Sequence, residues 1–547
     1  MRSGSVCTNF TPASFHAVLR VALVIAIITP GGAEEIHTHA ASPVIVGTIT
    51  FPISCSKQAQ SHIESGLAMF HSFLFYDAES QFKMAADVDA SCAMAYWAQA
   101  IGLYRPLAYL PATQDMKRGW ELIQKAHQLT AKSQRERDYL HAAEVLYRPD
   151  ARDYARRNHD YSAQLEEIYR SYPDDTEAAV FYALSVLTFA DSDDSIQDAE
   201  KAIGILNPIF AAHPDHPGVA HYIIHAADNP QLAAKGLSAA GKYAEIAPAA
   251  PHALHMPSHI FARLGLWQED IDSNLASLHA AQNPSAVDVG GEHQLHAMEF
   301  LEYAYLQIGE DDKAKALVEK GAKITYEQVD PNLHDYVNRT RANSPALYYL
   351  ETRNWKAAQA LSPDPTAEPY NQAITFWAQA VAAGHLHDLT VAQNAVAQYD
   401  AMLELTKKGP RPRNVKSMMT RHDEAHAWLL ALQGKDDEAV MLLRKLADRQ
   451  DVEGKGEIET PAREMLADML MELNRPAEAL IEYEKSLNTD PNRFNGLYGA
   501  GRDAELLGDY KQANIYFMQL MRNCAVAGSR RPELLHAREL TEERKKL

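Results

Sequence analysis

The sequence predicts an all-α protein, an α-solenoid in which antiparallel helix pairs stack one after another. Apolar residues recur with helical periodicity along almost the whole chain, and no segment shows the regular alternation of a half-buried strand. The clearest internal repeat lies near the C-terminus, where Ala479 and Ala513 are 34 residues apart, as are Tyr483 and Phe517. A fixed period of this length is the signature of stacked two-helix units.

The composition indicates a folded protein and disfavours two classes of partner. Hydrophobic residues make up 46% of the 547 residues and charged residues 23%, as in ordinary globular proteins. The formal net charge of −20 lacks the basic footprint of non-specific nucleic-acid binders, so we expect no nucleic-acid partner. After residue 33 no apolar run is long enough to cross a bilayer, so we expect no membrane insertion of the mature chain.

The N-terminus is typical of an export signal. Arg2 and Arg20 precede the apolar run "VALVIAIIT", and the small residues "GGA" then end at Ala33. A short apolar segment with a basic start and a small-residue cleavage site predicts a signal peptide over 1–33, the alternative being an uncleaved anchor. We therefore expect a periplasmic or secreted protein in which residues 34–55 form an N-terminal linker.

Three cysteines, Cys55, Cys92 and Cys524, follow the predicted signal peptide. Cys55 and Cys92 are 37 residues apart, about one repeat, so stacking of helix pairs could bring them together. An oxidising compartment permits a disulfide between them. In that case Cys524 would be a buried free thiol; the alternative is that Cys55 and Cys92 are both reduced core residues.

The repeated residues resemble the signature of the tetratricopeptide repeat (TPR) family, in which small residues lie where two helices cross and large ones fill the gaps. The positions that carry this resemblance are Gly66, Ala78, Phe82, Phe261, Gly265, Trp267, Asn274, Gly309, Ala314, Gly434, Ala439 and Gly508. The resemblance covers most of residues 56–525. It implies that the first helix of each pair lines a concave inner surface. We divide this region into N-terminal repeats over 56–300 and C-terminal repeats over 301–525, followed by a charged tail over 526–547.

Histidines are concentrated in one part of the chain. Ten of the 24 lie between His213 and His296. His221 and His225 are four residues apart and therefore share one helix face, and His255 and His259 repeat that spacing exactly 34 residues later. The two pairs should therefore occupy equivalent positions on neighbouring inner helices, on the open side of the groove.

Further residues extend this pattern towards a single patch. His252 precedes His255 by three residues, and alignment on Gly309 makes His296 equivalent to His252 after an insertion over 282–291 that we expect to fold over the groove. Imidazoles one helical turn apart can chelate one ion. The predicted metal ligands are His221, His225, His252, His255, His259 and His296. Asp228 and Glu299 are the candidate additional ligands or general bases.

The expected cofactor is one transition metal ion, zinc, copper or iron, held in the groove of an exported protein. Two other functions use the same residues. One is a metal-dependent enzyme, either a hydrolase or an oxygenase. The other is a scaffold that binds a peptide or an envelope protein, with the histidines as polar contacts or pH-sensitive groups. A weaker candidate ligand pair is His422 and His426, which flank Glu424 but do not form an HExxH motif.

The segments "HPGVAHYIIHAADNP" and "HALHMPSHIFARLGLW" are also similar to a group of exported bacterial TPR proteins with histidine-bearing repeats. This resemblance implies the fold and a shared histidine patch, and it implies no particular reaction. The chain contains no GxSxG, Walker or GxGxxG motif that would indicate another enzyme class.

Overall fold

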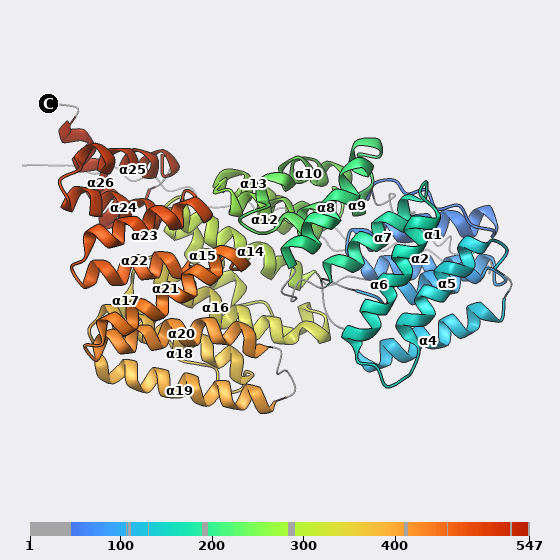
Figure 1. The fold of residues 1–547 in the computed structure, drawn as a ribbon, viewed down its shortest axis with the longest axis horizontal. Coiled ribbons are helices and arrows are strands. Elements are labelled where there is room, and N and C mark those ends of the chain that lie inside the picture. The colour runs from blue at the N-terminus through green and yellow to red at the C-terminus, as the bar shows by residue number, and fades with distance from the viewer. Residues whose placement is uncertain are drawn as a thin grey trace, which may run out of the picture. The chain divides into compact units, whose positions relative to one another are not determined.

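A computed structural model shows an all-α protein (Figure 1). It describes residues 45–544 except 106, 108–110, 130, 189–194, 283–289, 410–413, 457 and 526–527. The predicted signal peptide, the first part of the predicted linker and most of the insertion over 282–291 lie outside these described residues. Within them every regular element is a helix, which confirms the predicted fold class.

The first half of the described chain forms helices that contact their sequence neighbours (Figure 1). These helices are α1 (Lys57–His71), α2 (Phe75–Val88), α3 (Ala93–Ile101), α4 (Thr113–His127), α5 (Gln134–Tyr147), α6 (Tyr154–Ser171), α7 (Thr176–Leu187), α8 (Ser195–Ala212), α9 (Pro217–Ala227), α10 (Ala233–Ile246), α11 (Pro251–His255), α12 (Pro257–Arg263) and α13 (Trp267–Ala281).

The second half continues in the same way. Its helices are α14 (Gly291–Gln307), α15 (Asp311–Gly321), the 3₁₀ turns η1 (Tyr326–Gln328) and η2 (Pro331–Leu333), α16 (His334–Glu351), α17 (Trp355–Gln359), α18 (Pro369–His385), α19 (Leu389–Lys408), α20 (Val415–Leu432), α21 (Asp436–Glu453), α22 (Ala462–Glu472), α23 (Pro476–Thr489), α24 (Phe494–Leu506), α25 (Tyr510–Asn523) and α26 (Pro532–Arg544).

The glycines of the repeat signature lie in the turns between paired helices. Gly265, Gly309, Gly434 and Gly508 all have a positive φ, between 64° and 81°. After Gly265, the backbone N–H of Leu266 donates to the carbonyl of Phe261 at 2.8 Å, and the corresponding bond recurs after each of the other three glycines. This is the left-handed helix end that glycine adopts most easily. The recurrence supports a TPR-type solenoid.

Small residues of the signature also lie where helices cross. A Cβ atom added to Gly66 on α1 would lie 2.4 Å from the ring of Phe82 on α2, and Ala78 beside it is fully buried. The same relationship holds between Gly501 on α24 and Phe517 on α25. Glycine is therefore required at these crossings because no side chain fits there.

The buried apolar residues form successive clusters along the solenoid. The first cluster extends from Val46 to Ile260 and the next begins at Ala262, so the apolar core changes near residue 261. Two further clusters cover residues 346–500 and 494–537. The candidate site lies at the change between the first two clusters.

Both ends of the described chain are more ordered than the sequence suggests. In the stretch 45–55, predicted as part of a linker, the fully buried Phe51 stacks on Trp97 at 5.4 Å between ring centroids. In the predicted charged tail, helix α26 buries Leu534 against the last repeat. Both stretches pack on the repeats because their few apolar residues fill gaps in the core.

Cys55 and Cys92 form a disulfide and Cys524 is a buried free thiol, which selects the first of the two cysteine arrangements. The bridge joins the segment before α1 to the start of α3. Burial raises the pKa of the Cys524 thiol to about 12. Among the described residues, no helix combines the length and apolar character needed to span a membrane.

Candidate metal centre

The six predicted histidines form two groups of three, and in each group the ring nitrogens face one another. The first group is His221 and His225 from α9 with His252 from α11. The second is His255 from α11 and His259 from α12 with His296 from α14. Within each group one nitrogen per ring lies within 4.8 Å of the others. The sequence therefore identified the residues, but it predicted one patch where the structure has two.

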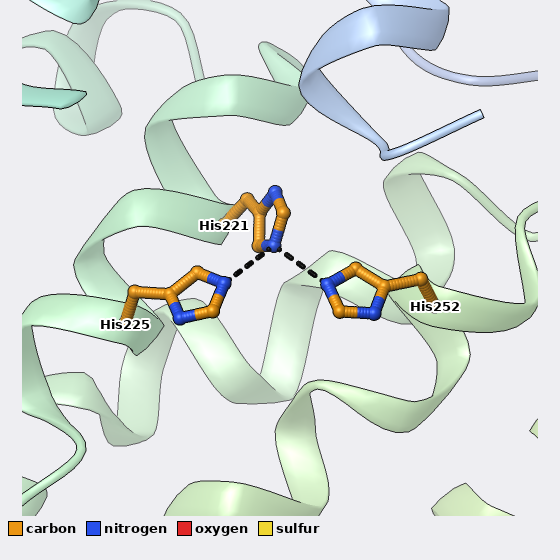
Figure 2. A group of neighbouring side chains, drawn as sticks. All are labelled: His221, His225 and His252. Atoms are coloured by element: carbon orange, nitrogen blue, oxygen red, sulfur yellow. Dashed lines mark hydrogen bonds between the residues drawn. The ribbon is translucent and has the colours of Figure 1, made fainter. Parts of the chain in front are cut away.

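In the first group, the Nε2 atom of His221 lies 3.0 Å from the Nε2 atoms of both His225 and His252 (Figure 2). On the other side of the His221 ring, Nδ1 donates to the backbone carbonyl of His71 at 2.6 Å. A carbonyl only accepts, so the proton of neutral His221 lies on Nδ1 and its Nε2 carries a lone pair. That single lone pair faces two other rings at equal distance.

In the second group, the Nε2 atoms of His255 and His259 lie 2.9 Å apart. His255 Nδ1 donates to Asn274 Oδ1 at 2.6 Å, and Asn274 is held in that orientation because its Nδ2 donates to the carbonyl of Asp270. His259 Nδ1 donates to Asp228 Oδ2 at 2.8 Å. Both neutral rings therefore direct an Nε2 lone pair towards the other.

The third ring of the second group is held by an aromatic hydroxyl. His296 Nδ1 lies 3.0 Å from the hydroxyl of Tyr336 on α16. The His296 ring centroid is 4.2 Å from that of His255 and 5.9 Å from that of His259. The two groups are also close to each other, since the rings of His225 and His259 have centroids 6.4 Å apart.

The division into two groups does not coincide with the break between α11 and α12, because His252 and His255 both lie on α11, while His259 on α12 joins His255. Pro257 is the first residue of α12 and has no N–H with which to continue the α11 hydrogen-bond ladder. The helix ends at His255 and begins again after Met256. The rings divide according to the helix that they contact: His252 contacts His221 on α9, whereas His255 and His259 contact Phe300 on α14. The prediction treated residues 252–263 as one helix and so placed all three histidines on one face.

The 34-residue period is reproduced in the geometry. His221 and His225 are separated by 3.0 Å between Nε2 atoms, and their equivalents His255 and His259 by 2.9 Å. In each pair the first histidine is fixed through Nδ1 by an acceptor on another helix. The supporting acceptors differ between the pairs, because one is a backbone carbonyl and the other a side-chain amide.

The histidines are more buried than the predicted open groove implies. His221 is fully buried and His255 is 2% exposed. Burial, followed by the nearby His225, lowers the pKa of His221 well below its usual value. Burial and the neighbouring His221 and His225 act in the same direction on His252. Both rings are therefore neutral at pH 7, the form that binds metals.

The two candidate carboxylates lie behind the histidines and belong to neither group. Asp228 accepts from His259 Nδ1 and, at 2.9 Å, from Arg263 Nε, so it orients a predicted ligand. Glu299 accepts from the hydroxyl of Tyr336 at 2.5 Å and also from Arg339 and Thr340. The prediction that either is a ligand or general base is not supported by these contacts.

Two of the supporting residues, Asn274 and Tyr336, were not predicted to touch the site. Asn274 was identified only as part of the repeat signature, and Tyr336 carried no sequence signal. His71 contributes its backbone carbonyl to His221, while its ring contacts Glu177 at 3.0 Å and Tyr222 at 2.7 Å. Contacts of this kind join segments about 150 residues apart, which a repeat pattern does not specify.

A third group lies apart from these six histidines. His422 Nε2 and His426 Nε2 are 3.3 and 3.1 Å from the same oxygen of Asp400. This arrangement adds a carboxylate that the sequence did not pair with the two histidines. Glu424, the residue between them, points to Trp377 instead and accepts its Nε1–H at 2.7 Å.

The two three-histidine groups open into one cavity of about 320 Å³. His225 and His252 reach it from the first group, and His259 and His296 from the second. The remaining lining is provided by the turn between α1 and α2, the start of α2, Leu107, Met256, Asp330 and residues of α14, η2 and α16.

The fold and these groups define a TPR-type helical-repeat protein with a histidine-lined cavity. Among solved structures the chain is similar to a TPR protein from Parabacteroides merdae ATCC 43184, with 16% identity, a TM-score of 0.27, and coverage of 53% of this chain and 98% of that one. It is also similar to a monomeric mutant of IFIT1 with Gppp-AAAA, with 13% identity, a TM-score of 0.37, and coverage of 86% and 96%. The human IFIT1 dimer with PPP-AAAA has 10% identity, a TM-score of 0.37, and coverage of 79% and 90%. No family model and no curated protein matches the chain.

Proposed function

We propose that this protein binds transition-metal ions through its two three-histidine groups, one ion in each. The observation that carries the proposal is the pair His255 and His259, whose Nε2 atoms are 2.9 Å apart while both Nδ1 atoms contact acceptors. Two lone pairs that face each other at this distance repel unless a cation lies between them. Nitrogens bound to one ion at about 2.0–2.1 Å are separated by roughly 3 Å, which is close to this arrangement.

The donor set favours zinc, copper or iron. Each group offers three neutral imidazoles, and imidazole is a common ligand of these ions. The second contacts on Nδ1, to a carbonyl, an amide oxygen and a carboxylate, are the kind that fix ligand orientation in metal sites. Asp228 also supplies negative charge close to the second group.

A metal-dependent enzyme is the second candidate function. Structural zinc sites are closed by four protein ligands, whereas catalytic sites have three and leave a position for water or substrate. Both groups here have three histidines, and both reach the cavity. A peptide scaffold has less support from this part of the molecule, because His221 and His255 are buried and do not present a polar surface.

We also propose that the protein is exported, as residues 1–33 suggest. The Cys55–Cys92 disulfide supports this location, because such bridges persist in oxidising compartments and are rare in the cytoplasm.

Elemental analysis of the purified protein tests the metal proposal. We expect about two zinc, copper or iron ions per chain, with one lost in His221→Ala/His225→Ala and the other lost in His255→Ala/His259→Ala. The matched control is His213→Ala/His279→Ala, which removes two exposed histidines outside both groups and should retain both ions. A doubly protonated His259 that donates from Nε2 to His255 would also explain the short contact, and in that case wild type would contain no ion at the second group.

A further inference from the structure

The group formed by Asp400, His422 and His426 lies on α19 and α20, two helices that carry none of the six histidines described above. His422 and His426 are one turn apart on α20 and therefore share one face of that helix. Asp400 reaches them from α19, and its Oδ1 atom contacts the Nε2 atoms of both rings. The ring centroids are 4.1 Å apart. Three side chains from two helices thus direct their polar atoms to one point.

The contact behind His422 determines which of its ring nitrogens carries the lone pair. His422 Nδ1 lies 2.9 Å from Asp423 Oδ1, and an ionised carboxylate only accepts, so Nδ1 is the donor. In the neutral ring the lone pair is then on Nε2, which lies 3.3 Å from Asp400 Oδ1. A lone pair and a carboxylate oxygen at this distance repel each other unless a proton or a metal ion lies between them.

A metal ion would satisfy the three side chains together. Protonation of both rings would also satisfy their contacts with Asp400, but it would place two positive charges on rings that are close to each other. One divalent ion needs only neutral imidazoles and a carboxylate. Two histidines and one carboxylate are a ligand set of zinc sites that leave a coordination position open. The contact of His422 with Asp423 is of the kind that orients a histidine ligand in such sites.

This group differs from the two three-histidine groups in its exposure to solvent. The side chains of Asp400, His422 and His426 are 46%, 22% and 31% exposed, whereas His221 is fully buried and His255 is 2% exposed. An ion held here could complete its coordination with water and exchange directly with the solvent. One of its ligands would also carry a negative charge, in contrast to the ligands of the three-histidine groups.

We propose that Asp400, His422 and His426 form a further metal site, which binds one divalent transition-metal ion such as zinc in exchange with the solvent. The bound ion connects α19 to α20. This inference does not rest on the proposed function of the three-histidine groups, because the site shares no residue and no helix with them.

Equilibrium dialysis against zinc tests the inference. Protein purified by gel filtration is dialysed against increasing free zinc at pH 8, where imidazole is ordinarily neutral, and the bound zinc is measured. We expect wild type to bind one ion per chain beyond those that it retains in gel filtration. His422→Ala/His426→Ala should bind this ion at least about tenfold more weakly. His213→Ala/His279→Ala, which removes two exposed histidines from other helices, should bind it as wild type does.

Asp400→Asn tests the contribution of the carboxylate and leaves both histidines in place. We expect the affinity for the additional zinc ion to fall by at least about tenfold, and this variant also serves if the double histidine variant does not fold. The matched control is Glu404→Gln, which removes an exposed carboxylate one turn further along α19 and should bind zinc as wild type does. Equal losses in the two variants would mean that zinc responds only to the charge of this helix, and would overturn the inference.

Two other results would overturn it. One is a wild-type protein that takes up no additional ion, in which case protons alone hold the two histidines against Asp400. The other is an additional ion that His422→Ala/His426→Ala binds with unchanged affinity. Failure of the proposed function gives a different result. Three-histidine groups that bind no ion would not change the difference in zinc uptake between wild type and His422→Ala/His426→Ala.

Discussion

Asp228 accepts a hydrogen bond from His259 Nδ1 at 2.8 Å and one from Arg263 Nε at 2.9 Å, and so joins the end of α9 to α12. The ion pair with Arg263 keeps the carboxylate ionised. This fixes the proton of neutral His259 on Nδ1 and directs the Nε2 lone pair towards His255. A carboxylate predicted to be a ligand or a base thus orients a predicted ligand instead.

Asp228→Asn should weaken metal binding at the second group by about 10–100-fold, the usual effect of removing a supporting contact. The amide oxygen of the asparagine can still accept the hydrogen bond from His259 Nδ1. The loss of metal affinity would therefore result mainly from the removed negative charge and less from a changed orientation of the ring. Chelator competition measures the affinity. Asp272→Asn changes an exposed carboxyl on α13 and should bind as wild type does. An unaltered affinity in Asp228→Asn would mean that the carboxylate does not support an ion.

The Cys55–Cys92 bridge should stabilise the N-terminal repeats. It closes a loop of 37 residues, for which chain entropy predicts about 3–4 kcal/mol. Cys55→Ser/Cys92→Ser should lower the free energy of unfolding by about that amount in urea titrations. A reductant should have a similar effect on wild type and none on the double variant. If the reductant destabilises both proteins equally, its action does not depend on this bridge.

Glu424 should make stability depend on pH. Burial, followed by the charge of Glu459, raises its pKa to about 8, against about 4.5 in the unfolded chain. The folded state therefore holds a proton that the unfolded state loses, so stability falls as the pH rises from 4.5 to 8. Glu424→Gln mimics the neutral carboxyl. It should unfold like wild type at pH 4.5 and be more stable by at least about 1 kcal/mol at pH 8.5.

Urea unfolding at both pH values measures this difference. Glu438→Gln, an exposed carboxyl at the start of α21, is the matched control and should show no such gain. A Glu424→Gln variant that gains nothing at pH 8.5 would show that folding does not raise the pKa of Glu424.

Among the charged residues of the C-terminal repeats, Arg493 should be the one whose substitution lowers the stability most. It lies 2.7 Å from Glu351 and 2.8 Å from Glu464, and all three side chains are 1% exposed. Arg493→Met leaves two carboxyl groups buried without their cation, which should cost about 3–5 kcal/mol of stability. Arg475→Met removes a partly exposed pair with Glu478 and should cost at most about 1 kcal/mol. Similar losses in the two variants, measured by urea unfolding, would contradict this ranking.

Much of the fold could be predicted because the repeated residues meet local requirements of backbone conformation and helix packing. Gly265, Gly309 and Gly434 mark turns that require a positive φ, and Gly66 marks a helix crossing without room for a side chain. Such requirements recur with the period and can be read from one sequence. Phe73 shows the limit of prediction from the repeat pattern, because a phenylalanine there has the positive φ that glycine has at the other turns.

The candidate site was predictable to the level of its ligands only. Periodicity placed His221 with His225 and His255 with His259, because residues four apart share a helix face. It did not divide His252 from His255, since that depends on which neighbouring helix each ring contacts, α9 for His252 and α14 for His255. Nor did it predict the acceptors behind the rings, such as Asn274, which depend on contacts between separate helices.

The second histidine group lies where the apolar core changes near residue 261, and it can therefore hold the two parts of the solenoid together. Ile260 belongs to the first apolar cluster and Phe300 to the next, and His255, His259 and His296 span the two. A solenoid can open wherever neighbouring units hold each other weakly. An ion bound by these three histidines would connect the two apolar clusters. The repeats before and after residue 261 should then unfold in one transition when the ion is bound and in two separate transitions when it is removed.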